Sequence, residues 1–441
     1  MAAAEGANGI ARGDGFQSDI LTIDSPTGPK WRALLAFIGP GYLVATGYMD
    51  PGNWATAVAG GSAFGYKLLF VVMLANIMAI ILQSLAARLG LATNRDLAQT
   101  CRSALPLPAV WGLWVLAEVA ICATDLAEVI GTAIALNLLL GIPIIVGTIL
   151  TAADVLLVLA MQRLGFRWIE GFVMAMLLLI AGCFVVQMVL AHPDWHAVAL
   201  GFVPTGEVLS QPAMLYIAIG IVGATVMPHN LYLHSGIVHT TRSIAAGQDA
   251  RRTAVRLAEI DSAIALMMAV LINMALIVMA AAAFNASGHF EVSDLSQAYR
   301  LIAPLLGAPL AATLFAVALL ACGFNSTITA TMSGQLVMEG FLEIRLPAWA
   351  RRLVTRSIAI VPAVLTVIVL GEASIGRLLV LSQVLLSLQL PFAMIPLVVF
   401  TAQRGRMGAL VAPRWLTALA MTSAIVIVSL NVYLIAQLLA A

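Results

Sequence analysis

Two short polar stretches interrupt apolar segments of this sequence, and both hold residue types that bind cations. They are DPGN at 50–53 and MPHN at 227–230. An anionic carboxylate (Asp50) beside an amide oxygen (Asn53) attracts a cation, and oxygen ligands alone would suit Mg²⁺ or Ca²⁺. The thioether of Met227 is a softer ligand, which favours later transition metals. Together these residue types predict a site for Mn²⁺, Fe²⁺ or a neighbouring divalent ion.

Both stretches also contain helix breakers, so the backbone should contribute to the same site. Proline removes a backbone donor and glycine adds flexibility, and a helix is expected to unwind at each stretch. Unwinding frees carbonyl oxygens for a ligand, and those of Gly47 and Ala224 are the expected ones. The predicted site therefore combines side chains with freed backbone carbonyls.

The elements that carry these stretches are predicted to be membrane spans. The chain has 441 residues, of which 62% are hydrophobic and 10% charged, and its mean hydropathy is +1.02. These values lie outside the range of water-soluble domains, and about 20 apolar residues in a helix cross the hydrocarbon core. The pattern predicts an all-α membrane protein with eleven transmembrane helices, at 34–60, 66–88, 109–133, 142–162, 168–190, 211–239, 259–284, 307–338, 353–371, 375–401 and 416–440.

The distribution of lysine and arginine predicts the orientation of the chain. Nineteen of the 22 basic residues fall on the side that holds the amino terminus, and three fall on the other side. The positive-inside rule then places the amino terminus in the cytoplasm and the carboxyl terminus outside. Residues 1–32 are rich in Gly, Ala and Asp and are expected to form a disordered cytoplasmic tail.

The two interrupted spans are the first and the sixth, and their separation predicts an internal repeat. Because five is odd, the sixth span enters the membrane from the face opposite to the first, as in a 5+5 inverted repeat with discontinuous helices 1 and 6. The predicted units are 33–190, 208–402 and an additional eleventh helix within 403–441. Burying Asp50 at mid-membrane costs at least about 2.5 kcal/mol, which favours a functional role for it over a simple proline kink.

The third span carries three carboxylates, Glu118, Asp125 and Glu128. Spacings of seven and three place all three on one helical face. Such a strip is either a structural network of ion pairs with a basic neighbour such as Arg356 or a relay for protons. The sequence has no Gly-rich nucleotide loop of the Walker type, which argues against direct ATP hydrolysis.

Taken together, these motifs resemble the Nramp family, proton-coupled importers of divalent transition metals. The resemblance rests on the paired DPGN and MPHN signatures and on ATDLAE at 123–128, NSTITATMSGQ at 325–335 and SQVLLSLQLPFA at 382–393. It runs from about residue 36 to the carboxyl terminus. It implies the fold of the sodium-coupled amino-acid transporter superfamily (LeuT-like), in agreement with the predicted repeat.

Family membership would place the metal ligands on Asp50, Asn53, Met227 and the Ala224 carbonyl, with Gln383 joining in some states. Branches of the family that move Mg²⁺ or Al³⁺ lack the methionine. Its presence here therefore implies the transition-metal branch, with import by alternating access.

The resemblance also implies a proton route. It starts near Asp50 and His229, passes to Glu128 and Asp125, and leaves toward Arg356. Glu118 belongs either to this route or to an ion-pair network, and His229 is either part of the route or a packing residue. The family often has paired arginines at the start of the ninth helix, whereas RRLVTR at 351–356 separates Arg352 from Arg356 by one turn, so either arginine could complete the network.

Three other readings compete with metal transport. A cation-coupled symporter of a small amine or amino acid could share the fold, but it leaves the Met227 thioether without a use. An intramembrane enzyme would need a catalytic motif that the sequence lacks, and a passive channel is separable only by flux measurements. A formal net charge of +1 predicts no nucleic-acid partner, and we expect a monomer in membrane lipid with no cofactor.

Overall fold

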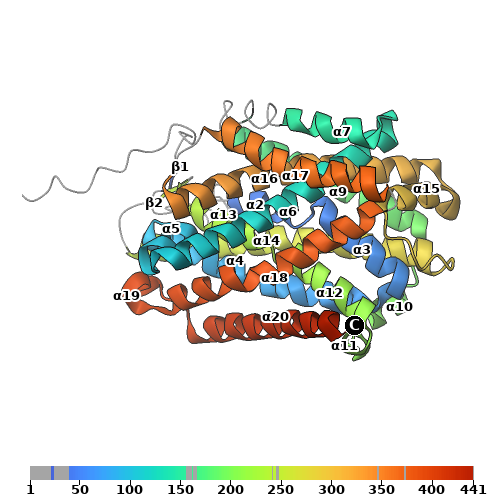
Figure 1. Cartoon of the computed structure of the whole chain (residues 1–441). Coiled ribbons are helices and arrows are strands. Elements are labelled where there is room, and N and C mark those ends of the chain that lie inside the picture. The colour runs from blue at the N-terminus through green and yellow to red at the C-terminus, as the bar shows by residue number, and fades with distance from the viewer. Residues whose placement is uncertain are drawn as a thin grey trace, which may run out of the picture.

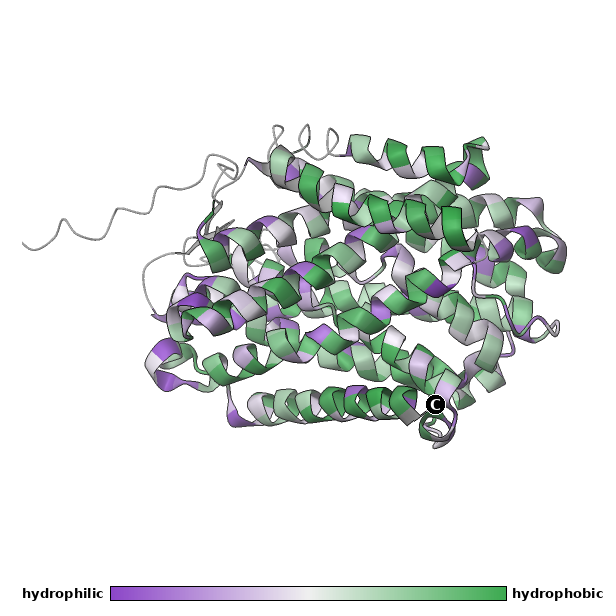
Figure 2. Ribbon diagram, in the orientation of Figure 1, coloured by the Kyte–Doolittle hydropathy of each residue, from purple (hydrophilic) through white to green (hydrophobic). Residues whose placement is uncertain are grey.

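The computed structural model describes residues 21–23, 39–154, 161, 166–240, 242–244, 248–344, 347–371 and 374–440. Almost all of this part of the chain is helical, and the long helices run side by side in one bundle (Figure 1). Within it, eight helical segments are long and apolar enough to cross a membrane. Hydrophobic residues cover most of the ribbon, and hydrophilic ones gather at its two ends (Figure 2). The chain is therefore a multi-pass membrane protein.

The first predicted span is broken where the proline and glycine predict it. Helix α2 (Pro40–Gly47) ends before Asp50, and α3 (Pro51–Phe64) begins directly after it. Asp50 caps α3, because its Oδ1 accepts the Asn53 N–H at 2.8 Å. Pro51 occupies the first helical position, where its missing N–H costs no hydrogen bond. The break is therefore encoded locally by the sequence.

The sixth predicted span is broken in the same way. Helix α12 (Pro212–Thr225) and helix α13 (Pro228–Thr240) are separated by Val226 and Met227. Pro228 begins α13, so the second break also starts a new helix with a proline.

The remaining predicted spans each overlap a helix over their described residues. Residues 155–160 and 162 of the fourth span lie outside the described part of the chain. The corresponding helices are α4 (Leu69–Thr93), α6 (Leu107–Leu140), α7 (Ile144–Leu150) with η2 (Thr151–Ala153), α9 (Phe166–Ala191), α14 (Gln248–Ala280) with η3 (Ala281–Asn285), α16 (Pro309–Leu342), α17 (Ala348–Leu370), α18 (Ile375–Ala402) and α20 (Arg414–Ala440).

Short elements join these long helices. They are η1 (Gly65–Leu68), α5 (Leu97–Ala104), α10 (Trp195–Leu200), α11 (Glu207–Ser210), α15 (Leu295–Leu306), α19 (Arg404–Met407) and η5 (Gly408–Leu410). Helices α3, α4, α6, α12, α14, α16 and α18 pack on one another around the two breaks. Helix α20 lies along one edge of the bundle and packs mainly on α18 (Figure 1).

A two-stranded parallel sheet departs from the sequence prediction. Strand β1 (Leu21–Ile23) pairs with β2 (Arg242–Ile244), with Leu21 opposite Arg242. The prediction of a disordered tail over 1–32 is therefore wrong for these three residues. A partner strand satisfies the backbone groups of β1, and composition gives no sign of a partner more than 200 residues away.

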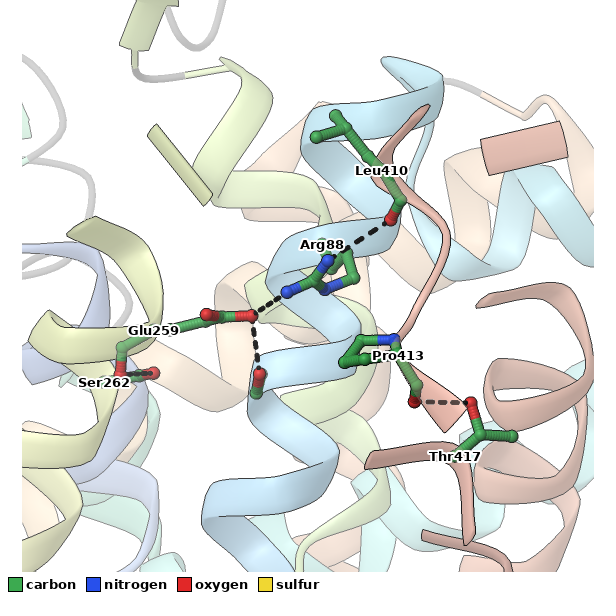
Figure 3. A network of polar contacts seen from close by, with 7 residues as sticks. Arg88, Glu259, Ser262, Leu410, Pro413 and Thr417 are labelled. Atoms are coloured by element: carbon green, nitrogen blue, oxygen red, sulfur yellow. Dashed lines mark hydrogen bonds and ion pairs between the residues drawn. The ribbon is translucent and has the colours of Figure 1, made fainter. Parts of the chain in front are cut away.

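A polar network joins α4, α14 and η5 (Figure 3). Arg88 of α4 donates to Glu259 of α14 at 2.6 Å and to the Leu410 carbonyl of η5 at 3.4 Å. Ser84 donates to the same Glu259 oxygen at 2.9 Å. Two long helices and the segment that leads into α20 are thus joined through one guanidinium group.

Candidate metal centre

The two helix breaks meet in the middle of the bundle, and Asn53 joins them. Its Nδ2 donates to the Tyr48 carbonyl at 2.7 Å and to the Ala224 carbonyl at 2.9 Å. The first carbonyl belongs to the α2–α3 break, and the second belongs to the last turn of α12. Residues about 170 positions apart in the sequence are thus in direct contact, as the sequence predicts for a site shared by both breaks.

Asp50 lies at this meeting point and is completely buried. One carboxylate oxygen, Oδ1, caps α3 through the Asn53 N–H. The other oxygen, Oδ2, has a long contact of 3.4 Å with Gln383 Nε2 of α18. A hydrogen bond this long is weak, so Oδ2 retains most of its capacity to bind a cation.

The side chain of Gln383 also lies at the meeting point of the two helix breaks, beside Asp50. Its Nε2 also donates to Ser382 Oγ at 3.0 Å, and its Oε1 is buried with no hydrogen-bond partner among the described residues. A buried oxygen in this condition costs about 1–3 kcal/mol unless a ligand or water reaches it. Gln383 is therefore a candidate metal ligand in this conformation.

Met227 is fully buried in the break between α12 and α13. Its sulfur accepts a weak contact from Asn230 Nδ2 at 3.8 Å. Met227 lies three residues after Ala224, and the Ala224 carbonyl accepts a hydrogen bond from Asn53. The thioether thus belongs to the same break as the candidate carbonyl ligand.

Glycine is required for the close approach of the surrounding helices. A Cβ on Gly52 would collide with the Gln383 side chain, and one on Gly47 would collide with the Asn230 amide. Gly47, whose carbonyl is a predicted ligand, therefore lies close to Asn230 of α13. The absence of side chains at these two positions lets α18 and α13 close around the breaks.

Two contacts at the α2–α3 break were not predicted from the sequence. Asn273 of α14 donates to the Tyr48 carbonyl at 2.8 Å, and the Cys322 thiol of α16 donates to the Met49 carbonyl. Neither residue belongs to the site predicted from the sequence, and Asn273 is the one that the sequence could have indicated. An asparagine within an apolar span was the one signal that could have pointed to it, because such a side chain needs a partner in the membrane.

A second series of polar contacts extends from the Tyr48 side chain at the α2–α3 break. Gln83 Nε2 of α4 donates to the Tyr48 hydroxyl at 2.6 Å, and Gln83 Oε1 lies 2.9 Å from His234 Nδ1 of α13. The contacts now link α4 and α13 to the same residue, Tyr48, that joins the metal centre.

The predicted proton-route residues are only partly brought together. Asp125 and Glu128 are buried in α6, and Glu118 is partly buried on the same helix. His229 Nδ1 of α13 lies 3.5 Å from Thr124 Oγ1, one residue before Asp125. Helix α17 packs against α6, but the side chains of its Arg352 and Arg356 lie outside the described residues.

Comparison with known proteins agrees with this architecture. The family model described as natural resistance-associated macrophage protein-like (Nramp) matches residues 41–437. The divalent metal cation transporter MntH of Brucella suis is 58% identical over 426 residues, covering 96% of this chain and 93% of that protein. The protein of the same name from Nostoc is 54% identical and covers 92% of both chains.

Solved structures give the same result. A mutant of the Eremococcus coleocola manganese transporter is 39% identical, with a TM-score of 0.86, and the match covers 94% of this chain and 88% of that one. Mhp1, a nucleobase-cation-symport-1 family transporter, is 16% identical with a TM-score of 0.62 over 91% of each chain, which establishes a shared fold only. With a family model matched over nearly its whole length and relatives above 50% identity, this chain belongs to the Nramp family.

Proposed function

We propose that this protein imports divalent transition-metal ions, Mn²⁺ and also Fe²⁺, across a bacterial plasma membrane. The observation that carries the proposal is the Asn53 amide, which bridges the two broken helices beside the buried Asp50 carboxylate. The relatives named divalent metal cation transporter and the solved manganese transporter support the choice of substrate.

The metal is proposed to bind Asp50, Asn53, Met227 and the carbonyls of Ala224 and Gly47, with Gln383 approaching from α18. One carboxylate among neutral donors holds a divalent ion less tightly than a cluster of anionic ligands would. Such a ligand set suits an ion that must be released on the other side. The thioether adds preference for a softer ion over Ca²⁺ and Mg²⁺.

Transport is proposed to proceed by alternating access within an eleven-helix bundle. In this arrangement α2–α3 and α12–α13 are the discontinuous helices of a 5+5 inverted repeat, and their movement opens the site to one side at a time. The shared fold of Mhp1 supports this topology. The amino terminus is proposed to lie in the cytoplasm and the carboxyl terminus outside.

Proton coupling is proposed to use the buried carboxylates of α6. The metal displaces a proton from Asp50, and His229 and Thr124 connect the two helices across their 3.5 Å contact. Glu128 and Asp125 then carry the proton toward the arginines of α17, Arg352 or Arg356, with Glu118 further along the same face.

Uptake of Mn²⁺ into proteoliposomes, with internal pH recorded at the same time, tests the proposal. We expect entry of Mn²⁺ to acidify the lumen, and Asp50→Asn to abolish both signals because the anionic ligand is lost. Glu291→Gln, which changes an exposed acid in a connection, is the matched control and should transport normally. Metal entry without acidification would remove the coupling, and full activity of Asp50→Asn would remove the metal centre itself.

A symporter of a small amine or amino acid is the alternative. MhsT, solved with L-phenylalanine, has the same fold at 15% identity, and a cationic amine could pair with Asp50. Calorimetric titration with Mn²⁺ and with a panel of amines separates the two functions. Heat from an amine alone would favour the alternative.

A further inference from the structure

Thr327 of α16 lies between two buried carboxylates that belong to different elements. Its Oγ1 is 3.2 Å from Glu128 Oε2 of α6 and 3.3 Å from Asp154 Oδ2, which directly follows η2. The three residues are 1%, 0% and 9% exposed, respectively. Asp154 was not singled out by the sequence, and the stretch NSTITATMSGQ that holds Thr327 was used only as a family signature.

Thr327 belongs to a group of hydroxyl-bearing residues on α16. Ser and Thr side chains within helices commonly donate to a carbonyl of the preceding turn. Ser326, Thr329, Thr331 and Ser333 all do so in α16. Thr327 Oγ1 lies within hydrogen-bond distance of carboxylates on two other elements. Its hydroxyl thus reaches acids outside its own helix.

The number of protons on the Thr327 hydroxyl and the two carboxyl groups decides which hydrogen bonds they can form. A hydroxyl carries one proton, so it can donate to only one of two ionised carboxylates at a time. If one carboxyl group is protonated, that group donates to Oγ1 while the hydroxyl donates to the other carboxylate. The contacts of 3.2 Å and 3.3 Å are then both hydrogen bonds. The geometry therefore fits two carboxylates and a hydroxyl that share one additional proton.

We propose that Thr327 passes a proton between Glu128 and Asp154, which makes Asp154 a further proton-carrying residue of this transporter. In the step, the O–H bond of the protonated Glu128 breaks as its proton binds Thr327 Oγ1. The original hydroxyl proton of Thr327 moves at the same time to Asp154, so the hydroxyl is restored and the net charge of the trio is unchanged. The inference rests on the proton coupling proposed above.

The trio is connected to the metal centre along α16. Cys322 lies five residues before Thr327, donates its thiol proton to the Met49 carbonyl, and lies within electrostatic range of both Asp50 and Glu128. Asp125 of α6 is the other buried acid near Glu128 in the sequence. A proton that leaves Asp50 for Glu128 would therefore reach a branch point, with Asp125 on the same helix and Asp154 across the Thr327 hydroxyl.

The test compares variants that keep or remove the hydroxyl. Thr327→Ser retains it, whereas Thr327→Val has nearly the same shape and lacks it. Asp154→Asn removes the proposed acceptor. In proteoliposomes that report Mn²⁺ entry and internal pH together, we expect Thr327→Val and Asp154→Asn to lower the number of protons moved per Mn²⁺ by about twofold, because the branch through Asp125 stays open. Thr327→Ser should leave this number unchanged, since the donor is kept.

Further readouts separate a proton-carrying role from a structural one. Mn²⁺ binding to the purified protein, measured by calorimetry, should be unchanged in all three variants because the trio does not touch the proposed ligands. The double variant Thr327→Val/Asp154→Asn should lose no more proton flux than either single variant, because both act in one path. A Thr327→Val or Asp154→Asn protein that binds Mn²⁺ and keeps the original proton-to-metal ratio would overturn the inference. Absence of acidification in the unmodified protein would instead overturn the proposed coupling.

Discussion

Each polar side chain at the α2–α3 break has a defined partner, and these partners decide which atoms remain for a metal ion. Both amide hydrogens of Asn53 are used, on the carbonyls of Tyr48 and Ala224, so its oxygen is the atom left as a ligand. Asp50 uses one oxygen as a helix cap and keeps the other in a long contact with Gln383. A cation bound between Asp50 and Gln383 would replace this long hydrogen bond with two stronger contacts, one to each side chain.

The preference of the site for softer metal ions depends on the sulfur of Met227. The variant Met227→Ala tests this preference. Removing the thioether leaves only oxygen ligands, which Ca²⁺ accepts as readily as Mn²⁺ does. We expect Mn²⁺ affinity to fall by about tenfold, equivalent to about 1.4 kcal/mol, and Ca²⁺ to become an effective competitor. Calorimetry and competition uptake measure both effects.

Met421→Ala is the control for this experiment, because Met421 is exposed on α20, away from the breaks. Its substitution should leave Mn²⁺ binding and Ca²⁺ competition unaltered. An unchanged response to Ca²⁺ in Met227→Ala would refute the selectivity argument.

Asp96 is a buried acid between α4 and α5, and its titration makes the stability of the protein depend on pH. Asp96 caps α5, where its Oδ1 accepts the Gln99 N–H at 2.8 Å, and burial raises its pKa from 3.8 to about 7 against the opposing effect of this hydrogen bond. Because the folded pKa is the higher one, unfolding releases a proton between these two values. The free energy of unfolding should therefore fall as the pH rises through that window.

Asp96→Asn keeps a capping oxygen but cannot titrate. In detergent, the difference in melting temperature between pH 5 and pH 8 should be smaller for this variant than for the unmodified protein. Asp249→Asn, which changes an exposed acid of α14, is the control. An equal pH response in Asp96→Asn would show that another group is responsible.

At the scale of whole helices, close approach around the breaks depends on positions without side chains. Gly131 of α6 faces Pro51 of α3 so closely that an added Cβ would collide with the proline ring. A rigid ring at the start of a helix cannot move aside easily. Helix α6, with its carboxylates, is therefore held against the α2–α3 break by steric fit.

Gly131→Ala and Gly112→Ala form a matched pair on one helix. Gly112 has nothing within 4 Å of an added Cβ, so its substitution should be neutral or slightly stabilising. Gly131→Ala should destabilise the protein by about 1–3 kcal/mol through overpacking, and should slow Mn²⁺ uptake. Thermal unfolding and uptake of the two variants provide the comparison, and equal behaviour would exclude a steric role for Gly131.

The sequence predicts the helices and their breaks well because both are local features. Pro51 and Pro228 each suit the first position of a helix, next to polar residues that interrupt an apolar run, and a run of apolar residues forms a helix in lipid. The partners of the breaks depend on tertiary packing instead. Asn273, Cys322 and Asp154 reach the site or its surroundings from other helices, and no spacing within the sequence reveals which apolar span will lie beside which.

At the scale of the whole molecule, the proposed topology has the two ends of the chain on opposite sides of the membrane. Alkaline phosphatase fused after α20 should be active, because that enzyme folds outside the cytoplasm. The same enzyme fused after residue 402, at the end of α18, should be inactive, because one crossing is removed. An inactive fusion after α20 together with an active fusion after residue 402 would contradict the count of eleven spans and the positive-inside assignment.

The central claim is that a divalent metal ion binds where the two broken helices meet. Anomalous scattering from crystals soaked in Mn²⁺ tests it most directly. We expect one strong peak beside the Asp50 carboxylate and the Met227 sulfur, and no peak there in crystals of Asp50→Asn. A manganese peak elsewhere in the bundle, with none between these two side chains, would contradict the account.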